Sequence, residues 1–193
     1  MPIKNDEFQL ITEVLRGKKS SFRPLVEYYY PKVYSYIKNL VSNNSLTDDL
    51  TQETFIRAYS KLSTFDTSRH FGPWLIKIAY NVSMKHFRKT KNETSLANSP
   101  DLQTNPSDYT QAARFSDEKL LVDYYLEKMP LNLRIMFLLK HSLEFTYEEI
   151  AEICEEPIGT VKISVHRACY QIRQQLESSR KSIKDSSNAN EST

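Results

Sequence analysis

Residues 146–176, TYEEIAEICEEPIGTVKISVHRACYQIRQQL, decide the fold of this chain because they predict a short helix, a tight turn and a longer helix. Thr146 can cap the first helix, and Glu149, three residues later, can reach back to complete a capping box. Pro157 stands where the second helix can begin. In that helix apolar residues recur at steps of three and four, at Val161, Val165, Ala168, Ile172 and Leu176. One face therefore packs inward and the opposite face stays free.

The free face of the second predicted helix suits DNA. It carries Thr160, Lys162, Ile163, His166 and Arg167. No acidic residue lies between Pro157 and Leu176, so a major groove would accept this helix. An ordinary amphipathic hairpin with a solvated outer face explains the same pattern, since such hairpins are common. Glu155 occupies the turn, where glycine is favoured, and a left-handed backbone there would cost about 1 kcal/mol.

Composition favours an all-α chain with two helical domains. Only three glycines occur, and amphipathic stretches at helical spacing fill most of residues 1–90 and 116–180. Residues 91–115 lose this periodicity and collect Asn, Ser, Thr and two prolines, which predicts a flexible linker. Residues 181–193 are polar and are predicted to form a disordered tail. The second domain contains the helix-turn-helix.

The charge distribution is uneven along the chain. The formal net charge is +2, but residues 1–90 carry 14 lysines and arginines against 8 acidic residues. Residues 117–180 carry 8 basic residues against 11 acidic ones. The first domain is therefore the stronger electrostatic partner for nucleic acid.

Several classes of protein are not favoured by the sequence. The four histidines and two cysteines form no metal-ligand spacing, and no glycine-rich nucleotide loop or nucleophile and base pair stands out. We therefore expect no metal, no cofactor, no small-molecule substrate and no enzymatic activity. The N-terminus lacks the apolar core of a signal peptide, and the apolar runs are too short to cross a bilayer. This predicts a cytoplasmic protein without direct membrane insertion.

The first domain is predicted to open with two helices. Asp6 and Gln9 can cap a short first helix, and Gly17 suits a left-handed end to it. A long apolar pattern from Phe22 to Leu40 follows. Pro31 interrupts it, which predicts a kink or two abutting helices.

Residues 46–62, LTDDLTQETFIRAYSKL, predict a further helix with two distinct sides. Its apolar side has Leu50, Phe55, Ala58, Tyr59 and Leu62. The other side gathers Asp49, Gln52, Glu53 and Ile56. An isoleucine within a polar patch suggests a binding surface, whereas a solvated acidic face is the alternative.

Two separate motifs resemble bacterial RNA polymerase sigma factors of the extracytoplasmic-function (ECF) type. The run EIAEI, followed by P-I-G-T-V-K and H-R-A, is similar to their helix-turn-helix. D-L-x-Q-E-x-F-x-R-A-Y resembles the segment with which they grip the coiled coil of the largest catalytic polymerase subunit. The resemblance implies that core polymerase meets Asp49, Gln52, Glu53 and Ile56.

The resemblance extends to the segment that would read the minus-ten promoter element. Residues 63–72, STFDTSRHFG, form a polar loop that in this family takes up an unstacked base, and W-L-x-x-I-A-x-N resembles the minus-ten reading helix. Polar side chains can bond to a base edge, aromatic rings can stack on bases, and cations can hold phosphates. The implied minus-ten residues are Ser63, Thr64, Phe65, Asp66, Arg69, Lys77, Asn81, Lys85, Arg88 and Lys89.

Taken together, the resemblance implies a promoter-specificity subunit in the bacterial cytoplasm. Its partners would be core RNA polymerase, promoter DNA and an anti-sigma factor. The minus-thirty-five element would be contacted by Thr160, Lys162, Ile163, His166 and Arg167. Ile163, Ser164 and Val165 replace the commoner S-R-L of the family, which leaves the minus-thirty-five preference undefined. The alternative is a stand-alone helix-turn-helix regulator, which would leave the patch on residues 46–62 unused.

Overall fold

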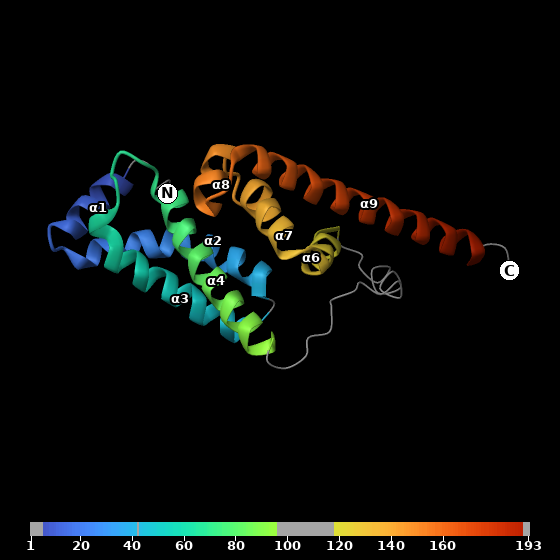
Figure 1. Cartoon of the computed structure of the whole chain (residues 1–193), viewed down its shortest axis with the longest axis horizontal. Coiled ribbons are helices and arrows are strands. Elements are labelled where there is room, and N and C mark those ends of the chain that lie inside the picture. The colour runs from blue at the N-terminus through green and yellow to red at the C-terminus, as the bar shows by residue number, and fades with distance from the viewer. Residues whose placement is uncertain (1–5, 42, 96–117, 191–193) are drawn as a thin grey trace.

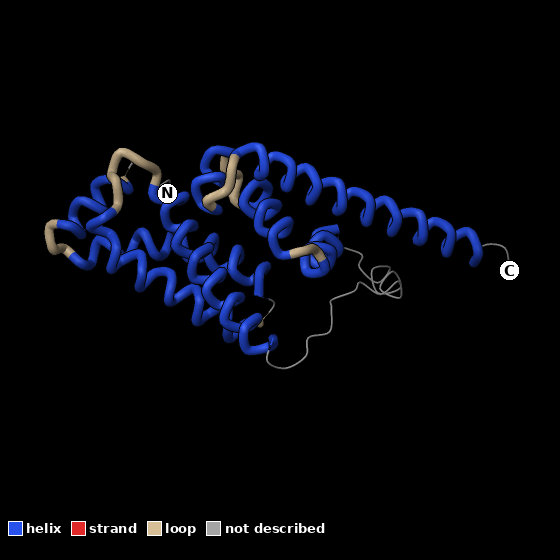
Figure 2. Tube along the Cα trace, viewed as in Figure 1, coloured by secondary structure: helices blue, strands red, loops and turns tan. Residues whose placement is uncertain are grey.

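The computed structural model describes residues 6–41, 43–95 and 118–190. Every regular element in these ranges is a helix (Figure 2), so the expected all-α class is confirmed. The helices form two groups (Figure 1), one from the N-terminal half and one from the C-terminal half. The long last helix runs away from the first group.

The N-terminal domain is built from four α-helices and two short 3-10 turns. They are α1 (Glu7–Leu15), η2 (Lys19–Ser21), α2 (Phe22–Val41), α3 (Asn44–Lys61), η3 (Leu62–Thr64) and α4 (Phe71–Ser95). α2, α3 and α4 pack against one another, with Leu25, Ile37 and Leu75 fully buried between them. This apolar core fixes the outer faces of α3 and α4, which carry the candidate site.

The two ends of α1 differ in how well the sequence predicts them. Gly17 has a φ of +98°, which confirms the left-handed end of the helix. Asp6 makes no side-chain capping bond, so the predicted cap with Gln9 is wrong. The φ and ψ of Asp6 are −108° and −8°, in the helical region, whereas a capping residue usually has an extended backbone.

Pro31 lies inside α2 rather than between two helices. Of the two predicted alternatives, a kink or two abutting helices, the second is therefore wrong. Buried side chains flank the proline on both sides, with Tyr29 before it and Val33, Tyr36 and Ile37 after it. This packing holds one helix together across a residue that removes a backbone hydrogen bond.

The C-terminal domain contains four α-helices, with a π-helical turn extending the second. They are α6 (Glu118–Lys128), α7 (Leu131–Phe137) with η5 (Leu138–Ser142), α8 (Tyr147–Cys154) and α9 (Ile158–Asn190). α7 and α8 both pack against α9. α8 and α9 are the predicted helix-turn-helix. The predicted start of this domain at Ser116 lies outside the described residues.

Two helices continue beyond their predicted ends. α4 runs to Ser95, so the first residues of the predicted linker are helical, and residues 96–115 lie outside the described part. α9 runs to Asn190, where the sequence predicted a disordered tail from residue 181. Neither extension contains a glycine or proline, the two residue types that are least favourable inside a helix.

The two domains contact each other directly. α8 packs on α4, and α2 meets both α6 and α7. At the second of these contacts, Nη1 of Arg134 donates to the backbone oxygen of Leu40 at 3.3 Å. Apolar side chains from both halves join in one buried cluster that includes Tyr36 and Cys154. The described chain is therefore closed, with α8 against the first turns of α4.

Candidate nucleic-acid interface

The outer face of α3 carries the four residues expected to meet polymerase. Asp49, Gln52 and Ile56 are exposed, with Ile56 66% accessible, and Glu53 is half-buried. Glu53 accepts a hydrogen bond from Arg57 one turn later. The structure therefore brings these residues together on one face, with an isoleucine that no neighbour covers.

The buried face of α3 explains why its outer face is fixed. Asn43 caps the helix by accepting a hydrogen bond from the backbone nitrogen of Leu46 at 3.0 Å. Leu50, Phe55 and Ala58 are buried as predicted. Tyr59 on the same side is 38% exposed, and its ring packs 5.1 Å from that of Phe22. Its ring lies at the rim of the core.

The loop after α3 is ordered by its own side chains. Oδ1 of Asp66 accepts hydrogen bonds from the backbone nitrogen of Ser68 at 3.0 Å and from its hydroxyl at 2.7 Å. These bonds from Ser68 lower the pKa of Asp66. The hydroxyl of Thr64 donates to the backbone oxygen of Lys61 at 2.8 Å. Ser63, Thr64, Asp66 and Arg69 are all exposed in this loop.

Phe65 does not fit the role expected of it. The side chain is only 7% exposed, and its ring packs 5.6 Å from Phe71 and 5.0 Å from Trp74. A ring so enclosed cannot stack on a base in this conformation. The expectation that Phe65 contacts minus-ten DNA is therefore corrected, because the loop needs an apolar anchor beneath it.

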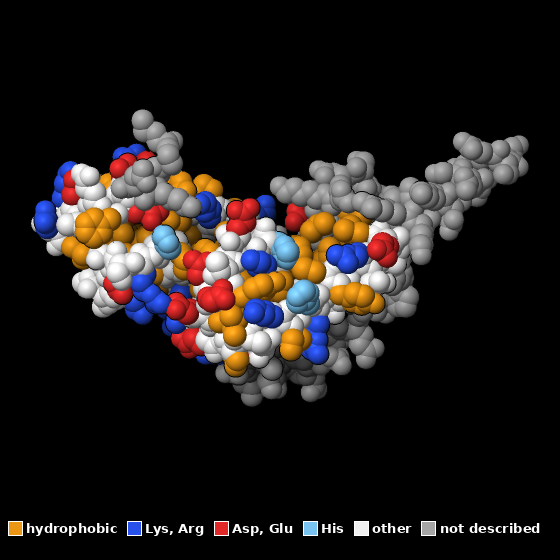
Figure 3. Space-filling model, turned by 90° about the horizontal axis from the view of Figure 1, so that it is seen from above, with side chains coloured by type: hydrophobic (Ala, Val, Ile, Leu, Met, Phe, Trp, Pro, Cys, Tyr) orange, Lys and Arg blue, Asp and Glu red, His pale blue; other side chains and the backbone are white. Residues whose placement is uncertain are grey.

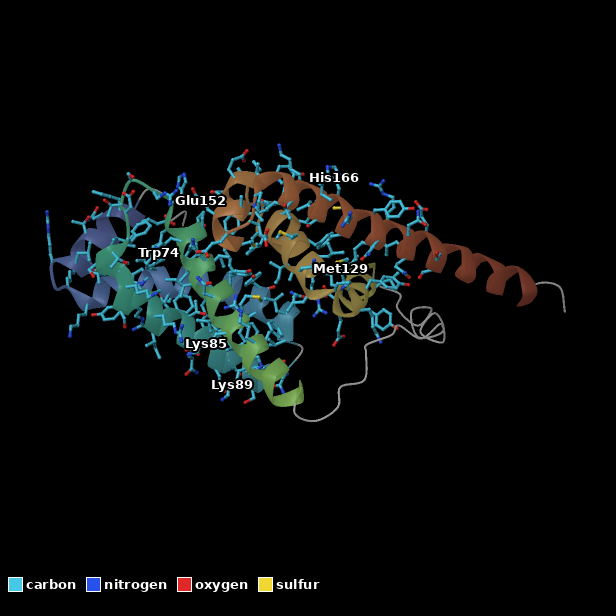
Figure 4. All side chains as sticks on the ribbon, in the orientation of Figure 1. Trp74, Lys85, Lys89, Met129, Glu152 and His166 are labelled. Atoms are coloured by element: carbon cyan, nitrogen blue, oxygen red, sulfur yellow. The ribbon has the colours of Figure 1, made fainter. Side chains whose placement is uncertain are left out.

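α4 presents a basic face that follows the helical repeat. Lys77 is half-buried, and Asn81, Lys85 and Arg88 are exposed at steps of three and four. Lys89 is also exposed, and Figure 4 shows it with Lys85 along the far half of the helix. The opposite face is buried as predicted, with Leu75, Ile78, Ala79 and Val82. The arrangement can hold several phosphates in a row.

α9 displays the predicted recognition residues on its outer side. Thr160, Lys162, Ile163, His166 and Arg167 are all exposed, whereas Val161, Val165, Ala168 and Ile172 are buried. Figure 3 shows this side of the molecule, where hydrophobic groups mix with Lys, Arg and His. Tyr170, 62% exposed, adds a ring to the same side of the helix.

Tyr147 is a neighbour of this face that sequence reasoning missed. Nζ of Lys140 lies 4.8 Å from the centre of its ring, and Nζ of Lys162 lies 5.7 Å away. Cation–π contacts of this kind orient lysine side chains. The only sequence clue was an aromatic residue directly after the Thr146 cap. The ring thus links a recognition residue to a second cation.

Two ion pairs between the domains were also not foreseen. Nη2 of Arg69 lies 2.6 Å from Oε1 of Glu152 on α8, and Figure 4 shows Glu152 where α8 approaches α4. Nζ of Lys77 lies 3.1 Å from Oε1 of Glu155. Both cations belong to the expected minus-ten set, so α8 touches that surface in the closed chain.

The two cysteines are free thiols in the C-terminal domain. Burial raises the pKa of Cys154 to about 12. Burial also raises the pKa of Cys169, whose Sγ lies 3.0 Å from Nε2 of His141. The described residues contain no cluster of three or more His, Cys, Asp or Glu that could hold a metal ion. Among those same residues, none of the helices is long and apolar enough to span a membrane.

Two known family models match this chain, one in each of its two helical domains. The model of Sigma-70 region 2 matches residues 25–93, which include most of α2, all of α3 and the basic face of α4. The model of Sigma-70 region 4 matches residues 119–172, which include α8 and the first part of α9 with the predicted recognition residues. Two domains of a sigma factor are thus present in the order expected from the sequence.

Individual relatives cover nearly the same length. The ECF RNA polymerase sigma factor SigW of Bacillus subtilis is 32% identical over 176 residues, which are 86% of this chain and 94% of the relative. The ECF RNA polymerase sigma-E factor of Haemophilus influenzae is 30% identical over 178 residues, 87% of this chain and 94% of the relative. The chain belongs to the ECF RNA polymerase sigma factors.

Solved structures share the fold. The sigma factor RpoE of Bartonella quintana, in complex with the anti-sigma factor NepR, aligns with a TM-score of 0.67 and 24% identity, over 81% of this chain and 96% of RpoE. CnrH, in complex with the cytosolic domain of CnrY, aligns with a TM-score of 0.66 and 20% identity, over 89% of this chain and 97% of CnrH. The family models and the relatives of 30% identity and more, rather than these structures, show that the protein is an RNA polymerase sigma factor, a promoter-recognition factor of transcription initiation.

Proposed function

We propose that this sigma factor uses three helix faces, each of which binds a different partner. The α3 face binds core polymerase through Asp49, Gln52, Glu53 and Ile56. The loop after α3 and the basic face of α4 hold the opened minus-ten strand through Ser63, Thr64, Asp66, Arg69, Lys77, Asn81, Lys85, Arg88 and Lys89. The outer side of α9 reads the minus-thirty-five element through Thr160, Lys162, Ile163, His166 and Arg167.

The observation that carries this proposal is the separation of buried and exposed residues on α3, α4 and α9. On α9 every expected contact residue is exposed while Val161 and Val165 between them are buried. A helix anchored in this way can enter a major groove without disturbing its own core. The uncovered Ile56 on α3 fits a protein partner rather than a solvated helix.

The protein is proposed to act without catalysing a reaction. Strand opening then draws on binding energy in the complex with polymerase, and the cations of α4 hold the single strand that results. Because its proposed partner is RNA polymerase, we also propose that the protein acts in the bacterial cytoplasm. A stand-alone DNA-binding regulator is less well supported, because it gives the α3 face no role.

Photo-crosslinking tests the assignment of the two DNA faces. A benzophenone amino acid at position 81 should crosslink to the non-template strand near minus ten, and one at position 166 should crosslink near minus thirty-five. Position 9, exposed on α1, is the control and should give no DNA crosslink. Crosslinks from position 166 to the minus-ten region, or from position 81 to neither element, would overturn the assignment of α4 to the minus-ten element and of α9 to the minus-thirty-five element.

An anti-sigma factor is proposed as a further partner. Both aligned structures are complexes, one of them named as a complex with an anti-sigma factor. A specific inhibitor would have to mask the uncovered apolar and polar groups of the α3 face. Affinity purification of the tagged chain from its own cells, with and without stress, should recover one such protein. Recovery of polymerase alone under every condition would contradict the proposal of an anti-sigma partner.

A further inference from the structure

An isoleucine stands in the middle of the charged outer side of α9. Ile163 is 54% exposed, and the apolar side chains that pack against the core of the described chain do not include it. Thr160 lies one turn before it, and His166 and Arg167 lie one turn after it, all three exposed. Residues 157–176 contain no acidic side chain. An apolar side chain among basic and polar groups fits an anionic partner that also offers an apolar contact.

The major groove of DNA offers this combination at one kind of base. Every base pair presents hydrogen-bonding groups at the edge of the groove, and the C5-methyl group of thymine is the apolar group among them. An isoleucine side chain neither donates nor accepts a hydrogen bond, so it gains nothing from the polar edges of the other bases. The phosphates that border the groove attract the cations around the isoleucine.

The first turn of α9 leaves room for a base edge to approach Ile163. Helical side chains lean toward the N-terminus of their helix, which directs Ile163 over the turn that contains Gly159. A Cβ atom added at Gly159 would meet no neighbouring atom within 4 Å, so the packing of the protein itself does not require a glycine there. Glycine is a poor helix former, but it leaves bare the part of a recognition helix that contacts base edges.

The neighbouring lysine does not need to cover the isoleucine. Lysine stems often lie over apolar surface, but the Nζ atom of Lys162 is 5.7 Å from the centre of the Tyr147 ring on α8. Ile163 is also β-branched, and such a side chain has one strongly preferred rotamer in a helix. Little conformational entropy is therefore lost when Ile163 packs against a base.

We propose that Ile163 reads a thymine of the minus-thirty-five element through the C5-methyl group of that base. The inference rests on the proposed role of the outer side of α9 in binding this element. It defines one feature of the minus-thirty-five preference, which the replacement of the commoner S-R-L by Ile163, Ser164 and Val165 left undefined. At this base pair, recognition depends on a methyl group rather than on a hydrogen bond.

Tyr170 is the matched apolar control on the same helix. It is 62% exposed and lies about two turns after Ile163, roughly 10 Å further along the helix axis. That distance removes it from the first turn of α9, where a recognition helix contacts base edges. Tyr170→Ala should therefore leave the effect of the thymine methyl group unchanged.

The test removes the methyl group from the DNA and the isoleucine from the protein. A promoter that the holoenzyme selects from a library is synthesised with deoxyuridine in place of each minus-thirty-five thymine in turn, on both strands. Uracil pairs as thymine does and lacks only the methyl group. One of these changes should weaken binding of the wild-type holoenzyme about fourfold, the factor that corresponds to burial of one methyl group. With Ile163→Ala the same change should alter binding by about 1.5-fold or less, whereas with Tyr170→Ala it should remain about fourfold.

A second pair of templates adds the methyl group to a different base. The sensitive thymine is replaced by cytosine or by 5-methylcytosine, each paired with guanine. The wild-type holoenzyme should bind the 5-methylcytosine template about fourfold more tightly than the cytosine template. Ile163→Ala should bind the two templates equally. Circular dichroism checks that this variant keeps its helices, as expected for a half-exposed position.

Three results would overturn the inference. The first is a selected minus-thirty-five element without a thymine that responds to deoxyuridine. The second is a methyl effect that persists in Ile163→Ala, because another residue would then contact the methyl group. The third is weaker binding of Ile163→Ala, but not of Tyr170→Ala, to core polymerase in the absence of DNA, because Ile163 would then contact protein.

Ordinary base changes separate this inference from the proposed function. If changes of minus-thirty-five base pairs weaken holoenzyme binding but no deoxyuridine does, the methyl contact alone is wrong and the proposed role of α9 stands. If no base change in this element alters binding and Arg167→Ala has no effect, the proposed role of α9 is wrong as well.

Discussion

Thr146 and Glu149 cap each other at the start of α8. The backbone nitrogen of Glu149 donates to Oγ1 of Thr146 at 3.2 Å, and the backbone nitrogen of Thr146 donates to Oε2 of Glu149 at 2.8 Å. Two backbone donors that a helix start leaves unpaired are thus satisfied. Because α8 supports α9 from one side and meets α4 on the other, this cap stabilises both contacts.

Thr146→Ala should lower the free energy of unfolding by about 1 kcal/mol, the usual loss for a threonine cap. Urea unfolding followed by circular dichroism measures the change. Thr160→Ala is the control, because Thr160 is exposed in the first turn of α9 and caps nothing there. Equal losses for the two variants would show that the capping box does not stabilise the fold.

Glu155 ends α8 with a left-handed backbone, at φ 57° and ψ 41°. A side chain is disfavoured there, so Glu155→Gly should be about 1 kcal/mol more stable than Glu155→Ala. Both variants lose the pair with Lys77, which makes alanine the matched control. Thermal or urea unfolding provides the comparison. A glycine variant no more stable than the alanine variant would mean that this backbone carries no strain.

Ile56→Glu should weaken binding to core RNA polymerase about tenfold or more, since an apolar anchor at an interface carries much of its affinity. The fold should be unaffected because Ile56 is 66% exposed. Phe8→Glu is the matched control, as Phe8 is 62% exposed and lies on α1 rather than on α3. Fluorescence titration with purified core enzyme measures both. Wild-type affinity in Ile56→Glu would remove the α3 face from the polymerase contact.

Arg167→Ala should reduce discrimination between a promoter and its minus-thirty-five mutant by about 1 to 3 kcal/mol if the guanidinium reads a base edge. Transcription from paired templates by the holoenzyme measures this ratio. Arg23→Ala, which removes an exposed arginine from α2, should leave the ratio unchanged. A ratio that Arg167→Ala does not alter would show that another residue reads the element.

Glu13 connects α1 to the turn that follows it. The hydrogen bond from Lys18, together with a bond from Ser21, lowers the pKa of Glu13 from 4.5 to about 2. A lowered pKa in the folded state contributes stability at neutral pH that is lost as the carboxylate is protonated. The melting temperature of wild type should exceed that of Glu13→Gln at pH 7, and the gap should close between about pH 4.5 and pH 2. A gap that is constant with pH would contradict the assignment.

Local patterns were sufficient for the outer faces of the helices. The spacing of Val161, Val165 and Ala168 correctly placed the buried side of α9, and the capping box correctly placed the start of α8. Both depend on neighbours within one or two turns, which a sequence shows directly. The same reasoning placed Ile56 on an exposed face.

Features that depend on distant residues could not be predicted in this way. Pro31 stays inside one helix because other helices pack around it, and Phe65 is buried because Phe71 and Trp74 come together beneath the loop. The pair between Arg69 and Glu152 spans 83 residues of sequence. Hydrophobic periodicity describes one helix at a time, so it does not predict contacts between residues that are far apart in sequence.

Start-site selection by the reconstituted holoenzyme tests the central claim most directly. The purified chain is mixed with sigma-free core RNA polymerase and a library of promoter fragments, and the transcripts are sequenced. We expect discrete start sites that share upstream minus-ten and minus-thirty-five elements, and we expect them to vanish with Ile56→Glu but not with Phe8→Glu. No stable complex and no start-site selection, with a core enzyme shown to be active, would contradict the account.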